Sequence, residues 1–241
     1  MQDLTNSPIF EAQIGLKLNS EQTVAHLKTL AEALKGEFPE IKPRYEITTE
    51  FKADGSDTKT NVIEQGIQLN SLNNDFAIIL QKDVFVFCAL GKYPGWITFK
   101  DKINSCLESM SKVDSTLQFI EVFSRYLNDI KIEGQYLNLS DYFTFVPSLP
   151  SVKPGLILNS FGVNFSASQV ETGFQTVFNF IPKQQPKQSN NEEFILDLSV
   201  SKRIEPICFS AAIWDNLDKA RDIKNYLFFG LITDKLTDRY K

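Results

Sequence analysis

The spacing of apolar residues divides the first half of the chain into strands and helices. Residues 9–18 alternate between apolar and polar side chains, as expected of a half-buried strand. Residues 20–34 carry apolar side chains at helical spacing behind Ser20, a favoured N-cap, and the pattern stops at Gly36. We predict a further strand at 43–52, three strands joined as antiparallel hairpins at 62–70, 76–83 and 84–90, and an amphipathic helix at 96–113.

The second half repeats much of this order. A long strand is predicted at 117–132 and a short helical or turn segment at 139–145, and strands at 156–167, 173–181 and 194–204 follow. The polar segment 182–193 is a predicted hairpin loop. The final segment, 214–240, has a wide apolar stripe at helical spacing with Asp215 as its N-cap. If this helix continues past Gly230, it runs for roughly 25 residues, or about 40 Å.

Both halves can be written as strand, helix, three strands, helix. This order predicts an α+β fold made of a duplicated unit, with residues 1–115 and 116–241 as two halves of one pseudo-symmetric globule. Antiparallel sheets would carry the helices on one face, and the long C-terminal helix would cover the apolar side of the second half. Such an arrangement leaves a sheet face, or a cleft between the halves, exposed for binding.

Composition refines this picture. The chain has 20 Phe among its 241 residues, which predicts a Phe-rich core. Its net charge of −5 and pI near 5.1 disfavour nucleic acid as a partner, since a phosphate backbone attracts basic surfaces. The N-terminus does not resemble a signal peptide, and no apolar run is long enough to span a bilayer. We therefore expect a cytoplasmic protein with no membrane contact.

Side chains that commonly carry catalysis are sparse. Cys88, Cys106 and Cys208 are far apart and are interpreted as buried small hydrophobic residues, so neither a disulfide nor a thiolate metal site is predicted. His26 is the only histidine and is interpreted as a structural residue at or near the surface. No phosphate-binding glycine loop or nucleophile motif accompanies it. We therefore expect no catalytic residue, no metal site and no cofactor.

One strand pattern keeps a metal-dependent nuclease open as a minor alternative. Glu46, Glu50 and Lys52 would share one face of the predicted strand 43–52. Carboxylates that hold a cation beside a lysine that stabilises developing charge are typical of such enzymes. Alternating charges are also what the solvated face of an antiparallel strand requires, and this second interpretation is favoured.

The long strand 117–132 carries three candidate binding residues. Arg125 and Tyr126 face opposite sides of the strand, and Asn128 follows two positions later. A guanidinium that points into the core or a cleft needs an acidic or carbonyl partner. The favoured interpretation is a structural clamp with Asp141 or Asp234, and the alternative is an anion or peptide contact in the cleft. Glu11, in the first strand, is a further candidate partner of the arginine.

The turn before the helix 96–113 supplies two more candidates. Tyr93 and Trp96 flank Pro94-Gly95, and the favoured interpretation is a tight turn whose tryptophan plugs the sheet. The alternative is an exposed aromatic anchor for a partner, because Trp and Tyr dominate binding hot spots. The candidate ligand-binding or partner-binding residues are therefore Glu11, Tyr93, Trp96, Arg125, Tyr126 and Asn128.

Five short motifs, spread over nearly the whole chain, resemble a sporadically distributed family of uncharacterised bacterial proteins of similar length. They are Pro8–Ala12, Tyr93–Trp96, Arg125–Asn128, Leu139–Phe143 and Leu231–Asp234. Where the family often carries a histidine early in the final helix, this chain has Ala220-Arg221, so a role of that histidine does not transfer to it. The resemblance implies an accessory gene of a toxin–antitoxin, immunity or phage-defence module.

These observations favour one function and leave two alternatives. The leading hypothesis is a non-enzymatic, cytoplasmic bacterial protein that binds another protein, as the antitoxin, immunity or sensor part of a mobile module. The first alternative is a small-molecule or nucleotide sensor that holds its ligand between the two halves. The second is the metal-dependent nuclease.

Overall fold

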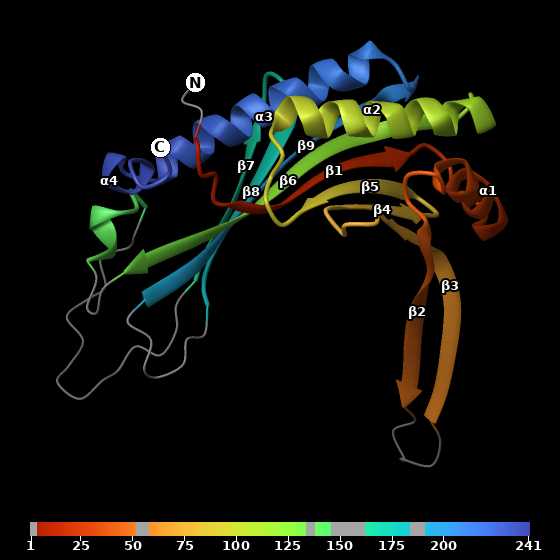
Figure 1. Ribbon diagram of the computed structural model, residues 1–241, viewed down its shortest axis with the longest axis horizontal. Helices are drawn as coiled ribbons and strands as arrows, with labels where there is room; N and C mark the ends of the chain where they lie inside the picture. The colour runs from red at the N-terminus through yellow and green to blue at the C-terminus, as the bar shows by residue number, and fades with distance from the viewer. Residues whose placement is uncertain (1–3, 52–57, 134–137, 146–161, 184–190) are drawn as a thin grey trace.

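A computed structural model describes residues 4–51, 58–133, 138–145, 162–183 and 191–241. These residues form one antiparallel sheet of nine strands with helices on one face (Figure 1). The elements of residues 1–115 are β1 (Ile9–Leu18), α1 (Val24–Leu34), β2 (Glu40–Phe51), β3 (Thr58–Asn70), β4 (Phe76–Gln81), β5 (Val84–Leu90) and α2 (Trp96–Val113). The elements of residues 116–241 are β6 (Gln118–Glu133), η1 (Leu139–Asp141), β7 (Val163–Gln169), β8 (Phe174–Pro182), β9 (Asn191–Cys208), α3 (Ala211–Leu231) and α4 (Asp234–Thr237).

The strand order explains how the two halves meet. It is β2-β3-β4-β5-β1-β6-β9-β8-β7, so β1 and β6 lie side by side and antiparallel at the centre. The α+β class, the antiparallel pairing and the helices on one face are as predicted. The strands form a single continuous sheet and not separate sheets, because β1 pairs with β6 through seven consecutive positions, Glu11 to Lys17.

The first half closely follows the apolar pattern. Alternation along β1 places Ala12, Ile14 and Leu16 under the helices, all fully buried. Helix α1 begins after Thr23 rather than Ser20, because the Thr23 hydroxyl accepts a hydrogen bond from the His26 amide at 3.1 Å.

The second half departs from the pattern in two places. Within the described residues, η1 is the only helical segment between β6 and β7, where a full helix would complete the predicted repeat. Strand β7 begins at Val163, while residues 156–161 of the predicted strand lie outside the described residues, as do 184–190 of the predicted loop.

The predicted unbroken C-terminal helix is wrong beyond Leu231. Ile232 is extended and forms an isolated β-bridge with Phe143, next to η1. The Thr144 amide donates to the Leu231 carbonyl at 3.0 Å, and the Thr233 amide donates to the Tyr142 carbonyl at 3.0 Å. The chain thus exchanges helical hydrogen bonds for bonds to the η1 segment, and α4 starts again after Thr233.

Two large apolar clusters lie between the sheet and the helices. One joins β1, β4, β5 and the first part of β6 to α1, α2 and the start of α3. The other lies between the end of α3 and the far ends of β6, β8 and β9, and its rings include Phe143, Phe178, Phe180 and Phe194. The Phe-rich core is therefore confirmed. No helix in the described residues is both long enough and apolar enough to cross a membrane.

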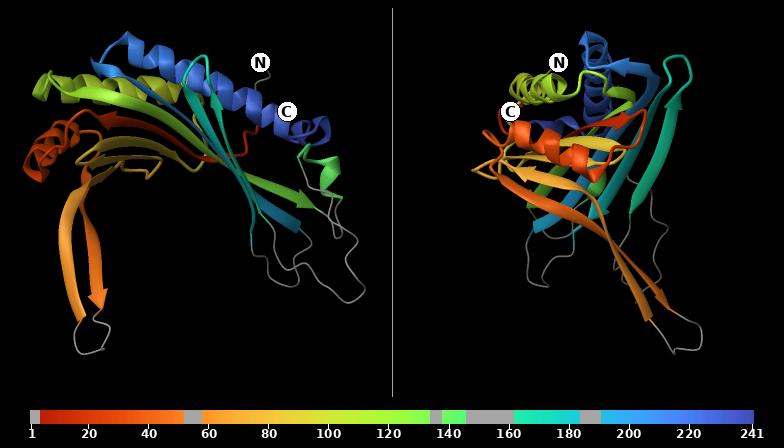
Figure 2. Two further views of the ribbon diagram at one scale, coloured as in Figure 1. Left: turned by 180° about the vertical axis from the view of Figure 1, so that it is seen from behind. Right: turned by 90° about the vertical axis from the view of Figure 1, so that its right-hand side faces the viewer.

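No helix of the described residues lies on the opposite side of the sheet, which is called the open face (Figures 1 and 2). At one end, β2 and β3 leave the sheet as a long hairpin that projects away from the helices. We call residues 45–51 and 58–64 of this hairpin the arm. It begins at a register shift after Arg44, next to Gly66, where an added Cβ would lie 2.2 Å from the Leu80 carbonyl oxygen. Glycine at this position allows β4 to approach where the arm leaves the sheet.

Candidate functional site

The six candidate residues lie on opposite sides of the sheet. Glu11 and Arg125 point to the open face, whereas Tyr93, Trp96, Tyr126 and Asn128 line a pocket on the side of the helices. Arg125 and Tyr126 face opposite sides of β6, as predicted, because successive side chains alternate across a strand. The candidates therefore belong to two surfaces, which are described in turn.

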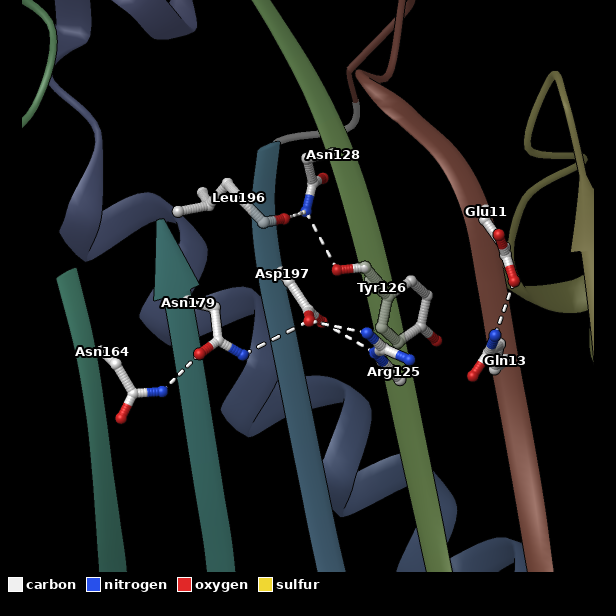
Figure 3. Close-up of polar contacts among 9 residues, drawn as sticks. All are labelled: Glu11, Gln13, Arg125, Tyr126, Asn128, Asn164, Asn179, Leu196 and Asp197. Atoms are coloured by element: carbon white, nitrogen blue, oxygen red, sulfur yellow. Dashed lines mark hydrogen bonds and ion pairs between the residues drawn. The ribbon is translucent and has the colours of Figure 1, made fainter. Parts of the chain in front are cut away.

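On the open face, Arg125 forms a two-pronged ion pair with Asp197 of β9 (Figure 3). Its Nε donates to Oδ1 at 2.9 Å and its terminal nitrogen donates to Oδ2 at 2.8 Å. These hydrogen bonds raise the pKa of Arg125. The predicted partners were wrong, since Asp141 instead pairs with Lys235 at 2.9 Å and Asp234 makes no contact with the arginine.

The ion pair is one end of a row of polar side chains that crosses four strands. The Asn179 amide donates to the Asp197 carboxylate at 3.3 Å, and the Asn164 amide donates to Asn179 (Figure 3). We call these four residues the polar ladder. Glu11 of β1 lies beyond the Arg125 end of the ladder and accepts a hydrogen bond from Gln13 at 2.5 Å. The ladder fixes the orientation of side chains that would otherwise be mobile on a solvated sheet face.

On the other side of the sheet, the helix-side pocket has a volume of about 740 Å³. It lies between the N-terminal segment 4–10, the loop from β5 to α2, the strand β6 and the helix α3. The loop contains Gly91 and Gly95, whose φ angles of 72° and 90° are readily adopted only by glycine. These turns carry Tyr93 to the pocket wall and start α2 at Trp96.

Aromatic rings form much of the pocket wall. The rings of Tyr93 and Tyr126 pack edge-on at 6.0 Å, and burial raises the pKa of Tyr93 to about 12. Trp96 packs edge-on against Trp214 of α3 at 6.4 Å, and its indole N–H donates to Asp218 at 2.7 Å. The expectation that Trp96 plugs the sheet is wrong, because this residue joins α2 to α3 within the helix layer.

Asn128 has a structural role at the floor of the pocket. It is 2% exposed, and its amide nitrogen donates to the Leu196 carbonyl at 2.9 Å and the Tyr126 carbonyl at 3.4 Å. It lies where the register between β1 and β6 shifts, between Ile9 and Glu11. Its side chain thus donates hydrogen bonds to backbone carbonyls beside the irregular stretch of the β1–β6 pairing.

The residue that the sequence argument missed is Lys224 of α3. It is 6% exposed, and its ammonium nitrogen lies 4.1 Å from the centre of the Tyr126 ring. Burial, and then the nearby charge of Arg221, lowers the pKa of Lys224 to about 7. The signal was present, since Lys224 lies four residues after Ala220 and four before Phe228, on the buried stripe of α3.

The remaining candidates from the sequence lie elsewhere. Glu46 of the arm accepts a hydrogen bond from Gln65, next to the arm, Glu50 is opposite Lys59, and Lys52 lies outside the described residues. Within the described parts of the chain, no three residues among His, Cys, Asp and Glu come together to hold a metal ion. His26 lies 3.1 Å from the Asp114 carboxylate, consistent with a structural role.

Two of the three cysteines behave as predicted. Cys88 and Cys106 are buried, and burial raises the pKa of each thiol to about 12. The prediction is wrong for Cys208, which is exposed at the end of β9, between Ile207 and Phe209, which both pack against the core.

Comparison with known proteins adds little to this geometry. No protein-family model matches the chain, and no curated protein matches it. A solved structure described as "KH domains" aligns over 93% of this chain at 8% sequence identity, with a TM-score of 0.23. The alignment spans 63% of that structure's chain, which is less than two thirds of its length.

Proposed function

We propose that this protein is a cytoplasmic recognition scaffold that binds another protein with its arm and the open face of its sheet. The observation that carries the proposal is a nine-stranded sheet whose one face is covered by no helix of the described segments, with an arm that extends from one end on that side (Figure 2). The biological setting that the sequence resemblance implies is the antitoxin, immunity or sensor part of a mobile module.

The arm provides the apolar contacts that a protein interface needs. Ile47 and Val62 are opposite each other across β2 and β3 and are 66% and 59% exposed, and Tyr45, two positions away, is 57% exposed. They share the arm face of Glu64, which pairs with Lys28 of α1 at 3.1 Å, so they lie on the side of the arm that adjoins α1. Such neighbouring apolar side chains on an uncovered ribbon favour contact with another protein.

Charge supports a protein partner over a nucleic acid. Arg125 is neutralised by Asp197 at 2.8 Å, and Lys183 lies 2.7 Å from Asp129. A phosphate backbone binds by releasing counterions to free cations, and these two cations are already paired. The polar ladder offers hydrogen-bond donors and acceptors to main-chain and side-chain amides instead.

We also propose that the two halves are related by duplication. Each half would begin with a central strand, β1 or β6, paired with its own last strand, β5 or β9. Since β1 and β6 are adjacent and antiparallel, a twofold axis perpendicular to the sheet would relate them. This relation supports an open face on which two similar halves contact one partner.

The proposal is tested by capture and by a matched pair of variants. Tagged wild type, Ile47→Glu and Ile97→Glu are used to capture partners from cells of the encoding organism, and binding of a recovered protein is then measured with purified components. Ile97 is 76% exposed on α2, on the opposite side of the sheet from the open face. We expect Ile47→Glu to weaken binding by about tenfold or more and Ile97→Glu to leave it unchanged.

Two outcomes would contradict this function. One is the absence of any stoichiometric protein in the captured material. The other is a partner whose affinity falls with Ile97→Glu and not with Ile47→Glu, because its binding site would then lie on the helix layer.

A further inference from the structure

The helix-side pocket is lined by a buried cation, Lys224, and a buried hydroxyl, that of Tyr126. Among the described residues no carboxylate forms an ion pair with the Lys224 ammonium, which lies 4.1 Å from the centre of the Tyr126 ring. The Tyr126 hydroxyl is buried; the Tyr93 side chain interacts with it and helps to raise its pKa, but no described residue reaches it with the geometry of a regular hydrogen bond. Both groups line the pocket. Burying an unpaired cation and a hydroxyl is unfavourable, so an apolar pair would serve packing better.

The net charge of the residues that line the pocket is positive, whereas that of the whole chain is negative. The pocket lining contains three cationic residues, Lys92, Arg221 and Lys224, and one carboxylate, Asp129. Asp129 is already engaged by Lys183 at 2.7 Å, while the carboxylate nearest to Arg221 is that of its neighbour Asp222, at 3.7 Å. A local excess of positive charge in a chain of net charge −5 favours an anion in this pocket.

The size of the pocket and the residues of its walls indicate what else the ligand contains. A volume of about 740 Å³ is within the usual range for small-molecule sites. The walls include Tyr93, Trp96 and Phe228, and the Arg221 guanidinium lies 5.7 Å from the centre of the Trp96 ring. Flat aromatic surfaces beside the two cations, Arg221 and Lys224, favour a ligand with a planar apolar body and a negatively charged end.

We propose that the helix-side pocket binds a small organic oxyanion, a carboxylate or phosphate carried on an aromatic body. The anion would lie between Lys224, Arg221 and the Tyr126 hydroxyl, and the ring would pack against Tyr93 and Trp96. The pocket lies between α2 of the first half and α3 of the second, where a ligand sensor would hold its ligand. The site is separate from the open face and does not depend on partner binding there.

The affinity for the anion should fall as the pH rises through about 7, where the pKa of Lys224 lies. The charged or titratable groups that line the pocket with Lys224 are Arg221 on α3, Tyr126 and Asp129 on β6, and Lys92 and Tyr93 on the loop before α2, and Asp218 on α3 also acts on Tyr126. Burial holds the pKa of Tyr93 at about 12 and that of Tyr126 well above its usual value. Lys224 is therefore the group whose protonation changes near neutral pH.

The test uses simple probes at pH 6.5. Phenyl phosphate and benzoate are titrated against the full chain, with tryptophan fluorescence as the readout because Trp96 lines the pocket. Benzyl alcohol and benzylamine serve as neutral and cationic analogues, and inorganic phosphate tests the anion without the ring. Lys224→Met and Tyr126→Phe are compared with Lys219→Met, which removes the same charge from an exposed position on α3.

We expect an aromatic anion to bind with millimolar affinity or better, and more tightly than its neutral and cationic analogues. Lys224→Met should weaken binding about tenfold or more, Tyr126→Phe should weaken it several-fold, and Lys219→Met should leave it unchanged. The proposal is overturned if benzyl alcohol binds as tightly as the anions, if no anion binds, or if the two lysine variants bind alike. Circular dichroism of both variants confirms that loss of binding is not loss of fold.

Discussion

Replacing Lys224 with methionine should stabilise the ligand-free protein at pH 6. A fall of the lysine pKa from 10.5 to about 7 corresponds to about 5 kcal/mol of unfavourable free energy for the protonated side chain in the fold. Methionine has a similar length, carries no charge and packs well in irregular apolar space. Because the ammonium faces a pocket and not a closed core, the expected gain in the free energy of unfolding is about 3 kcal/mol.

The gain should depend on pH in a defined direction. Below pH 7 the lysine is protonated in both folded and unfolded chains, so the full penalty applies to the wild type. Between about pH 7 and 10.5 the folded wild type loses this proton while the unfolded chain keeps it, so wild-type stability rises relative to the variant. The difference between the two proteins should therefore shrink across this range.

Urea denaturation at pH 6, 8 and 9.5, followed by tryptophan fluorescence, measures the difference. Lys219→Met is the control, because this lysine is exposed on the same helix and its loss should change stability by less than about 0.5 kcal/mol. A Lys224→Met variant that is less stable than the wild type at pH 6 would refute the reasoning. So would a gain that is the same at all three pH values, since it would not arise from the ammonium charge.

Two further predictions concern the fold. Gly66→Ala should lower the free energy of unfolding by about 2 kcal/mol or more, because its Cβ would lie 2.2 Å from a backbone carbonyl oxygen of β4. Gly36→Ala is the control and should not lower it, because an added Cβ there meets no atom within 4 Å. Equal effects of the two substitutions in urea denaturation would contradict the close approach at Gly66. A thiol reagent should modify Cys208 in the native protein, and should reach Cys88 and Cys106 only after unfolding. Mass spectrometry counts the modified thiols, and rapid native labelling of all three would contradict the described burial.

The sequence by itself determined most of the secondary structure. Alternation along β1 and helical spacing along α2 are repeated local signals, and both elements have the predicted bounds. Their apolar faces also indicated that helices cover one side of the strands. The end of α3 could not be predicted from the local pattern, because Leu231 and Ile232 continue the apolar spacing of the helix. The helix ends there because the backbone forms hydrogen bonds with the segment that follows η1, some 90 residues earlier in the chain.

Tertiary structure alone decided how the candidate residues are grouped. Alternation predicted that Arg125 and Tyr126 part across the sheet, but nothing local could select Asp197, which is on a strand 72 residues away, as the partner of the arginine. Lys224 lies on an apolar helical stripe, and the sequence could not reveal whether its charge would reach water, a carboxylate or a pocket. Pairing and burial depend on which distant segments meet, so the fold placed this cation in a pocket where no carboxylate of the described residues forms an ion pair with it.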